Sequence, residues 1–411
     1  MSGITPEEIE YRRRTPASER FFLEARRYLP GGDSRSTLFY PPYPAVLARG
    51  DGCRITDLDG NELLDFSGNH SVLVHGYGHP VVLDAVRRQL EAGTCFSGPT
   101  EPQLRLARML CERVPSLDLV RFTNSGTEAT LQAIRVARAF TGRQLIARAQ
   151  AAYHGSLETT MDSAHPDAIV IPFDDAEQAV RRIEARGREL AAVLVEPVQG
   201  SAGMIPATRE YLDRLRETTR QLGVLLVFDE VVSFRIAWGG AQEFFGITPD
   251  LTIFGKLIGG GFPLGVLGGR ADVMALFDPS RGPPAVPHPG SYNANPMSLA
   301  AGAATLELLT REAIGALNRR GDALREQLRD LFDHTDLRTR ITGLGSLFAI
   351  HPTEHPELRH RIFLGLYNQG VLIDPRGVGT LSTAIGEQEI ARFLEAFRTM
   401  QFLAPAGSSA L

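Results

Sequence analysis

The sequence predicts an α/β protein built on a mostly parallel β-sheet that is covered by helices. From about residue 78 to residue 300, short apolar runs alternate with stretches of helical periodicity such as 176–189 and 208–221. Apolar runs suit strands that are buried on both faces, and the helices between them suit the crossovers of a parallel sheet. A length of 411 residues suits one large domain and a smaller one. The runs are 145–147, 168–171, 192–195 and 224–228.

The elements before this region predict a helix and a hairpin. A charged segment over about 5–28 has helical character, and Pro and Gly at 30–32 predict a turn after it. Two strand-like runs, 54–56 and 63–65, flank Asp59-Gly60. An Asp-Gly pair between two such runs predicts a β-hairpin.

The elements after it predict a long loop and a helical C-terminal part. Residues 276–298 are rich in Pro, Gly and Asn, and loops of this length are often functional. Two helices follow at about 297–311 and 312–332, then a strand at 346–350 and a final helix near 387–400.

The composition favours a cytoplasmic protein that acts on small molecules. A formal net charge of -5 gives no electrostatic reason to expect nucleic acid or an anionic membrane as a partner. The N-terminal residues are polar, so we expect no signal peptide, and no apolar run approaches the roughly 20 residues that span a bilayer. An odd number of cysteines without a C-x-x-C pair indicates reduced thiols. They are Cys53, Cys95 and Cys111.

One residue type is almost absent. Of the 43 basic side chains, all but Lys256 are arginine. A mutational bias toward arginine codons explains why lysine is rare, but it does not explain why Lys256 is retained. Arginine stays protonated and cannot serve as an amine nucleophile, so a single retained lysine indicates Schiff-base chemistry. Its apolar neighbours disfavour an ammonium ion. The alternative is a surface lysine whose stem covers apolar residues.

Two further segments have the composition of ligand sites. Residues 123–129 (TNSGTEA) follow an apolar run and open a helical pattern, and such a junction suits a phosphate. A plain helix N-cap is the alternative. Asp229 ends the apolar run of 224–228, and the carboxyl ends of parallel strands are where ligands bind. A buried carboxylate needs a cationic or proton-donating partner, so a structural ion pair with an arginine is the alternative there.

Two glycine patterns resemble dinucleotide-binding fingerprints without their context. These are 76–78 and 259–265, and we expect Pro80 and Pro263 to interrupt the helix that each would need. Three histidines are spaced too irregularly to share one helix face, so we expect no metal site. They are His70, His75 and His79.

Taken together, these segments resemble the fold-type I pyridoxal-phosphate (PLP) enzymes, specifically the class III aminotransferases. The likeness runs from about residue 21 to residue 404. Within that class the chain resembles the β-amino-acid (β-phenylalanine) aminotransferases and glutamate-1-semialdehyde aminomutase. The segments that carry the likeness are TNSGTEA, AAYHGS (151–156), VLVEPVQG (193–200), VFDEVV (227–232), PDLTIFGKLIGGGFPLGVLGG (249–269), GSYNANP (290–296), PGGDSRSTLFYPPYP (30–44) and DPRG (374–377).

The resemblance implies a domain arrangement and a cofactor. A large domain over 76–300 would hold a mostly parallel seven-stranded sheet and bind PLP. Residues 1–75 and 301–411 would form a smaller α+β domain. The resemblance also implies a homodimer with shared active sites, in which the 276–298 loop contributes across the interface.

The resemblance further implies roles for residues in the large domain. Lys256 would form the internal aldimine and shuttle the proton, and Asp229 would pair with the protonated ring nitrogen. Val231 and Tyr153 would pack on opposite faces of the ring.

Other residues would hold the remaining groups of the cofactor. Glu196 would lie near the ring hydroxyl. Ser291 stands where the family usually has a threonine that reaches the phosphate of the neighbouring subunit. The phosphate of the same subunit would be held by Ser125, Gly126 and Thr127.

On the substrate side, Arg35 and Arg376 would bind a carboxylate, because arginine offers it a two-pronged hydrogen-bonding edge. Phe39 and Tyr40 would accommodate the substrate's side chain. A surface ion pair is the alternative for Arg35.

The expected activity is transfer of an amino group from a carboxylated donor, an aromatic β-amino acid, to a 2-keto acid such as 2-oxoglutarate or pyruvate. One alternative is a glutamate-1-semialdehyde-type 2,1-aminomutase, which needs no keto acid. A second is a dinucleotide-binding protein, which would take up no PLP. A third, a PLP-fold protein without catalysis, is disfavoured by the presence of Lys256, Asp229 and Tyr153.

Overall fold

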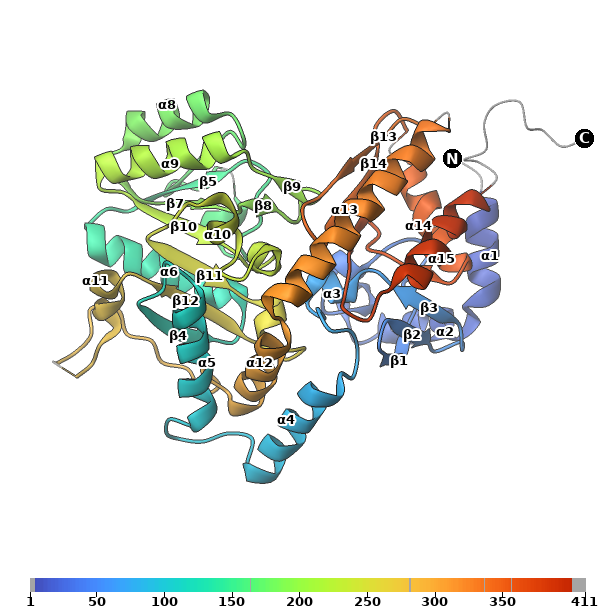
Figure 1. The fold of residues 1–411 in the computed structure, drawn as a ribbon, viewed down its shortest axis with the longest axis horizontal. Coiled ribbons are helices and arrows are strands. Elements are labelled where there is room, and N and C mark those ends of the chain that lie inside the picture. Colours follow the sequence, from blue (N-terminus) through green and yellow to red (C-terminus); the bar gives the residue numbers. More distant parts are fainter. Residues whose placement is uncertain (1–3, 163, 281, 336, 356, 401–411) are drawn as a thin grey trace, which may run out of the picture. The chain divides into compact units, whose positions relative to one another are not determined.

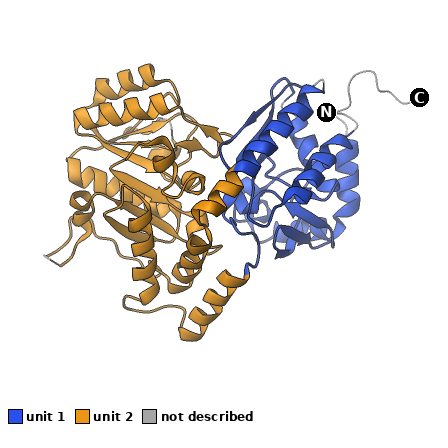
Figure 2. Cartoon of the chain, viewed as in Figure 1, with its two compact units in different colours: residues 1–79, 319–411 blue, residues 80–318 orange. Residues whose placement is uncertain are grey.

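The computed structural model describes residues 4–162, 164–280, 282–335, 337–355 and 357–400. The chain forms two compact units (Figure 2). Unit 1 comprises Met1–His79 and Arg319–Leu411, and unit 2 comprises Pro80–Asn318. The first and last residues of the predicted smaller domain, 1–3 and 401–411, lie outside the described residues.

Unit 2 is built on a seven-stranded sheet (Figure 1). The sheet pairs its strands in parallel except at β12, which runs antiparallel to both of its neighbours. This confirms the predicted α/β class and mostly parallel sheet. In spatial order the strands are β4 (Leu119–Thr123), β12 (Gly265–Gly269), β11 (Leu251–Phe254), β10 (Leu225–Asp229), β7 (Leu190–Val195), β5 (Leu145–Ala149) and β6 (Ala168–Ile171).

Helices cover both faces of this sheet, which explains why its central strands are apolar throughout. Every residue of β7 and β10 is buried. Ala129, Ala133 and Ala137 of α6 belong to the core, and small side chains let a helix approach a sheet closely. The helices of unit 2 are α4 (Pro80–Ala92), α5 (Glu101–Arg113), α6 (Gly126–Thr141), α7 (Glu158–Met161), α8 (Ala176–Arg186), α9 (Arg209–Leu222), α10 (Ala241–Phe245), α11 (Ala271–Met274) and α12 (Pro296–Leu308). Its shorter elements are β8 (Val198–Gln199), β9 (Ile205–Pro206), η3 (Ser233–Ile236), η4 (Lys256–Gly259) and η5 (Ala275–Phe277).

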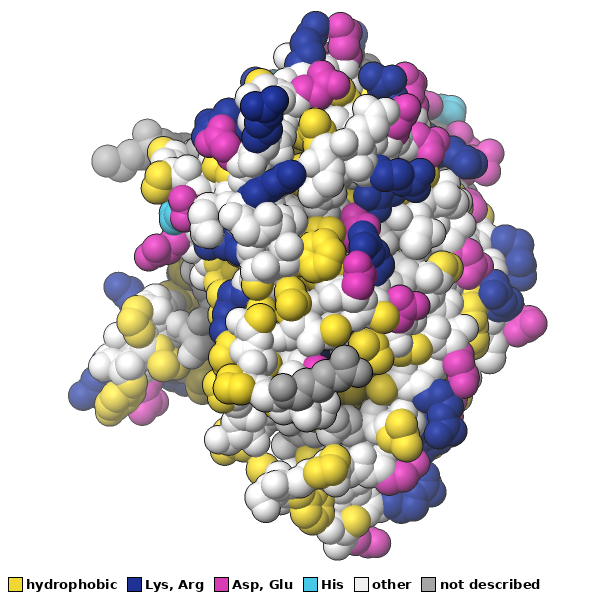
Figure 3. Space-filling model, turned by 90° about the vertical axis from the view of Figure 1, so that its left-hand side faces the viewer, with side chains coloured by type: hydrophobic (Ala, Val, Ile, Leu, Met, Phe, Trp, Pro, Cys, Tyr) yellow, Lys and Arg dark blue, Asp and Glu magenta, His cyan; other side chains and the backbone are white. Residues whose placement is uncertain are grey.

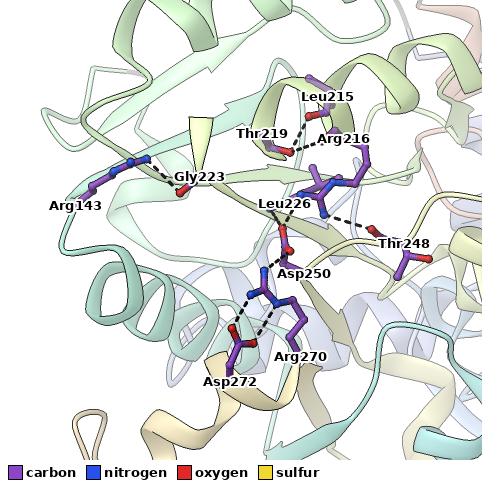
Figure 4. Close-up of polar contacts among 10 residues, drawn as sticks. All are labelled: Arg143, Leu215, Arg216, Thr219, Gly223, Leu226, Thr248, Asp250, Arg270 and Asp272. Atoms are coloured by element: carbon purple, nitrogen blue, oxygen red, sulfur yellow. Dashed lines mark hydrogen bonds and ion pairs between the residues drawn. The ribbon is translucent and has the colours of Figure 1, made fainter. Parts of the chain in front are cut away.

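A buried carboxylate secures the edge of the sheet where β10 and β11 begin (Figure 4). Asp250 accepts a hydrogen bond from Leu226 N at 2.8 Å. Arg216 and Arg270 contact its two oxygens at 2.9 and 2.8 Å, and Arg270 also reaches Asp272. The carboxylate thus joins helix α9, two strands and the start of α11 at the edge opposite to the strand ends that carry Asp229.

Unit 1 combines two small sheets with helices from both ends of the chain. The predicted hairpin is confirmed, because Arg54 pairs with Leu64 in antiparallel strands β2 and β3. Phe66 and Phe393 stack with ring centroids 4.5 Å apart in its core. The sheets are β1 (Leu47–Asp51), β2 (Arg54–Asp57), β3 (Glu62–Asp65) and β15 (Val371–Leu372), and β13 (Thr339–Thr342), β14 (Leu347–Pro352) and β16 (Val378–Thr380). The helices are α1 (Pro6–Arg14), α2 (Pro16–Ala25), η1 (Pro30–Gly32), η2 (Ser36–Leu38), α3 (Gly68–Ser71), α14 (Leu358–Asn368) and α15 (Glu387–Arg398), and α13 (Arg311–Asp333) begins in unit 2 and continues in unit 1.

Three local expectations differ from the structure. The segment 5–28 is two helices, because Pro16 cannot continue α1 and instead begins α2. Pro80 does not interrupt a helix but is the first residue of α4, where a missing N–H costs nothing. Strand β12 was not predicted, since its sequence, GVLGG, has little β-propensity.

The described part of the chain has no helix that is both long enough and apolar enough to cross a membrane. On the face shown in Figure 3, basic and acidic side chains are interspersed and neither sign forms a continuous patch.

Candidate active site

The chemically distinctive residues of unit 2 follow the carboxyl ends of parallel strands, which meet at one edge of the sheet. Asp229 is the last residue of β10, and Lys256 follows β11 after a single glycine. This is the edge at which open α/β sheets bind ligands. Also after strand ends are Ser125 behind β4, Tyr153 and His154 behind β5, and Glu196 behind β7.

Asp229 has a buried partner that was not predicted. His154 Nδ1 lies 2.9 Å from Asp229 Oδ2, and the two side chains are 0% and 5% exposed. Val231 N donates to the other oxygen at 3.1 Å. Burial opposes a charge on His154, but the hydrogen bond and the charge of Asp229 outweigh it and raise the pKa of the histidine. The sequence argument that Asp229 needs a proton-donating partner is met by this histidine and not by an arginine.

Glu196 lies in the same electrostatic group. Its two oxygens accept hydrogen bonds from Tyr153 N at 3.0 Å and from Gly200 N at 3.1 Å. Burial raises the pKa of Glu196 to about 7, against the opposing charge of His154. Buried groups with strongly shifted pKa values cluster at functional sites, so Glu196 belongs with Asp229 and His154 in the candidate site.

The start of α6, residues 125–127, forms a closely packed backbone cradle. Ser125 Oγ caps the helix by accepting from Glu128 N at 3.1 Å, so the N-cap alternative holds for this hydroxyl. The N–H groups of the following Gly126 and Thr127 lie in the first helical turn and have no intrahelical acceptor. A Cβ on Gly265 would lie 2.0 Å from Ser125 O, so only glycine allows this approach. The arrangement suits an anion at the helix N-terminus.

Lys256 has an unusual backbone. It is the first residue of η4 and has a φ of 52°, which a lysine adopts rarely. Such conformations cost energy and cluster at functional sites. A Cβ on the preceding Gly255 would lie 3.4 Å from Val231, so this glycine sits against the residue predicted to contact the ring.

The segment that carries Ser291 is tied to the cradle. Asn124, next to Ser125, donates from Nδ2 to Asn293 Oδ1 at 3.1 Å. Ser291 and its neighbour Tyr292 are exposed. Tyr153 is exposed, with its hydroxyl 3.4 Å from Ser156 Oγ.

The two predicted substrate arginines lie in unit 1. Arg35 is exposed and donates from Nη1 to Asn69 Oδ1 at 3.0 Å. Arg376 donates from Nε and Nη2 to Asp374, each at 2.9 Å. Burial of Asp374 opposes its ionisation, but hydrogen bonds from Arg376 and His70 outweigh it and lower the pKa of Asp374.

Tyr40 does not have the role expected of it. It is buried, its hydroxyl accepts from Ala45 N at 2.8 Å, and its ring packs on Phe363 with centroids 4.5 Å apart. It therefore belongs to the core of unit 1, whereas Phe39 is exposed.

Comparison with known proteins identifies the family to which this chain belongs. Residues 39–400 match the family model of the class III aminotransferases, and the chain belongs to that family. It is a PLP-dependent transaminase of fold-type I.

Two relatives and one solved structure show which members of the family this chain is similar to. The chain is 43% identical over 407 residues to a β-phenylalanine transaminase of Variovorax paradoxus, covering 94% of this chain and 93% of the relative. It is 39% identical to a glutamate-1-semialdehyde 2,1-aminomutase of Methanothermobacter thermautotrophicus over 87% of this chain and 92% of the relative. A solved structure described as a transaminase with PLP bound superposes with a TM-score of 0.91 at 36% identity, covering 93% of this chain and 96% of that one.

The residues at the strand ends of unit 2 fit this cofactor. The cradle at α6 offers N–H groups for a phosphate, and a Cβ on Gly126 would lie only 3.1 Å from Val231. Asp229 supplies a buried carboxylate, and the one lysine of the chain stands after the neighbouring strand.

Proposed function

We propose that the enzyme transfers the amino group of an aromatic β-amino acid to a 2-keto acid such as 2-oxoglutarate or pyruvate. The observation that carries the mechanism is the buried Asp229–His154 pair at the same sheet edge as Lys256 and the start of α6. The β-phenylalanine transaminase at 43% identity supports the choice of donor.

The catalytic residues have separate tasks in this proposal. PLP supplies an electron sink for the carbon that carries nitrogen. Lys256 would hold the cofactor, and its Nζ would move a proton at the substrate carbon. Asp229 would keep the ring nitrogen protonated through its negative charge, and His154 is a positioning residue that holds Asp229 in place.

The remaining contacts orient the cofactor. Val231 and Tyr153 would contact opposite faces of the ring, and Glu196 would lie on its hydroxyl side. The phosphate would be bound by the first turn of α6, with Ser291 contributed by a partner subunit. The phosphate-binding residues are Ser125, Gly126 and Thr127.

Arg35 and Arg376 bind the carboxylate groups of donor and acceptor. A β-amino acid carries its carboxylate one carbon farther from the amine than an α-amino acid does, so the placement of these two guanidinium groups selects the donor. Hydrogen bonds to Asn69 and Asp374 hold them in defined orientations, which supports this role.

The proposal also includes an oligomeric state and a cellular location. The enzyme is a homodimer, which the exposed Tyr292 beside Ser291 supports, and light scattering of the purified protein tests it. It acts in the cytoplasm, in keeping with three free cysteines.

A donor panel tests the proposed activity. The purified enzyme is mixed with α-, β- and ω-amino acids and simple amines, and conversion of the cofactor to its amine form is followed by absorbance. We expect the fastest conversion with aromatic β-amino acids and reversal by a 2-keto acid. Isomerisation of glutamate-1-semialdehyde without any keto acid would favour the second candidate, the 2,1-aminomutase, which the 39% identical relative supports.

A further inference from the structure

Residues Gly68–Ser71 form a left-handed turn in unit 1. The φ angles are 53° at Gly68, 51° at Asn69, 56° at His70 and 73° at Ser71. Left-handed backbone brings the Cβ of an L-residue against the following carbonyl oxygen, so consecutive non-glycine residues rarely adopt it. Strain of this kind persists only where surrounding contacts fix it, and it clusters at functional sites.

Contacts outside the two central side chains hold this backbone. Buried Asp65 accepts on Oδ1 from Ser67 N at 2.7 Å and from Gly68 N at 3.1 Å. Ser71 N donates to Ser67 O at 3.0 Å and closes the turn. The two central side chains are therefore free to serve another purpose than holding the turn.

Those two side chains contact the two arginines. Asn69 Oδ1 accepts from Arg35 Nη1 at 3.0 Å. The next residue, His70, has its Nδ1 2.7 Å from Asp374 Oδ2, and Asp374 holds Arg376. His70 Nδ1 also lies 3.4 Å from Arg376 Nη2. One short turn thus contacts both guanidinium groups, and it contacts the second mainly through the closer carboxylate of Asp374.

Asp374 occupies only one edge of the second guanidinium. Arg376 uses Nε and Nη2 for the two bonds to Asp374. The Arg376 side chain is 39% exposed, whereas that of Asp374 is 2% exposed. No described residue accepts a hydrogen bond from Nη1, so this end remains available to an anionic ligand.

We propose, resting on the proposed function, that Asn69 and His70 are positioning residues that determine which carboxylated donors and acceptors the enzyme binds. Asn69 acts on Arg35, and His70 acts on Arg376 both through Asp374 and by its own contact with Nη2. Because adjacent residues of one strained turn hold both guanidinium groups, the turn sets their spacing and direction. The spacing of two cationic groups discriminates ligands by where the carboxylate lies.

Glycine substitutions separate the side chains from the backbone of the turn. Asn69→Gly and His70→Gly remove the contacts, while glycine adopts positive φ without strain. Ser71→Gly is the matched control, because it is the same change in the same turn and Ser71 Oγ makes no hydrogen bond to a described residue. His70→Asn is the rescue variant, since its amide can donate near the position of Nδ1 and asparagine tolerates this backbone.

The measurement is the dissociation constant of the PLP-loaded enzyme for 3-phenylpropanoate and for 2-oxoglutarate, by calorimetry. Neither compound carries an amine, so neither reacts with that form. We expect Asn69→Gly and His70→Gly each to weaken at least one compound about tenfold, the scale of one lost charge-assisted hydrogen bond. Ser71→Gly should stay within about twofold, and His70→Asn should recover most of the loss.

Each outcome has a defined meaning. Unchanged affinities in both Asn69→Gly and His70→Gly, in variants that melt as the wild type does, would overturn the inference. Equal weakening by Ser71→Gly would also overturn it, because the effect would then belong to the backbone. A wild-type enzyme that binds neither compound contradicts both the inference and the arginine roles. Binding without transamination of any β-amino acid contradicts the proposed donor alone.

Discussion

Replacement of His154 tests the electrostatic centre of unit 2. His154 Nδ1 and Asp229 Oδ2 are 2.9 Å apart in a buried site. A hydrogen bond to a charged group contributes about 1.5–3 kcal/mol. Since about 1.4 kcal/mol is a factor of ten in rate, loss of the whole bond predicts a fall in kcat of roughly 10- to 150-fold.

Two variants separate the hydrogen bond from the charge. His154→Asn places a neutral N–H donor near the position of Nδ1, whereas His154→Leu leaves Asp229 with the bond from Val231 N at 3.1 Å. Steady-state kinetics with one donor should show a small loss in kcat for the first and the full loss for the second, with KM little changed. A His154→Leu enzyme that binds PLP normally and keeps kcat within about twofold would refute the reasoning.

The pH dependence of folding gives an independent check on the same pair. The pKa of His154 is raised above its ordinary value of 6.5 because Asp229 outweighs the effect of burial. Its contribution to stability is therefore fully present below about pH 6.5 and is lost as the pH rises through the folded-state pKa. The stability of cofactor-free wild type relative to His154→Asn should decline above about pH 6.5. A constant difference across that range contradicts the ion pair.

Three further changes have outcomes that the structure defines. Lys256→Ala should abolish amino transfer and the attachment of PLP by borohydride, since the chain has no other lysine; label on another residue would contradict its role. Gly265→Ala should weaken PLP affinity and stability, because its Cβ would lie 2.0 Å from Ser125 O; an unchanged cofactor titration would contradict the cradle. Asp250→Ala should lower the free energy of unfolding by about 2–4 kcal/mol, because it strands the largely buried Arg216. The control Asp272→Ala removes an exposed pair and should change it by less than about 1 kcal/mol in the same urea titration.

The sheet of unit 2 was predictable because its signals are local. The predicted apolar runs 145–147, 168–171, 192–195 and 224–228 correspond to β5, β6, β7 and β10, and the helices between them show their own periodicity. Asp229 follows directly from this pattern, since it is the first charged residue after a buried run. In the same way the start of α6 was visible as a change from apolar residues to Ser, Gly and Thr.

The features that could not be predicted depend on contacts between residues far apart in the sequence. Strand β12 is rich in glycine because a Cβ on Gly265 or Gly269 would lie 2.0 Å from Ser125 O or 2.4 Å from Asp250 O, so packing and not β-propensity selects these residues. Tyr40 lies in a segment rich in aromatic residues, and its contacts with the distant Tyr11 and Phe363 make it part of the core. His154 was visible within AAYHGS, but its partner lies 75 residues away.

The polar groups of the two units share one principle of construction. In unit 2, His154 orients Asp229; in unit 1, Asn69 orients Arg35 and Asp374 orients Arg376. Each proposed functional group is thus held by a partner from its own unit, which reduces the cost of ordering it when a ligand binds. Changes in the left-handed turn can therefore alter which carboxylates bind without disturbing the Asp229–His154 pair. Variation within residues 68–71 is accordingly where we expect members of this family to differ in substrate while sharing the same cofactor chemistry.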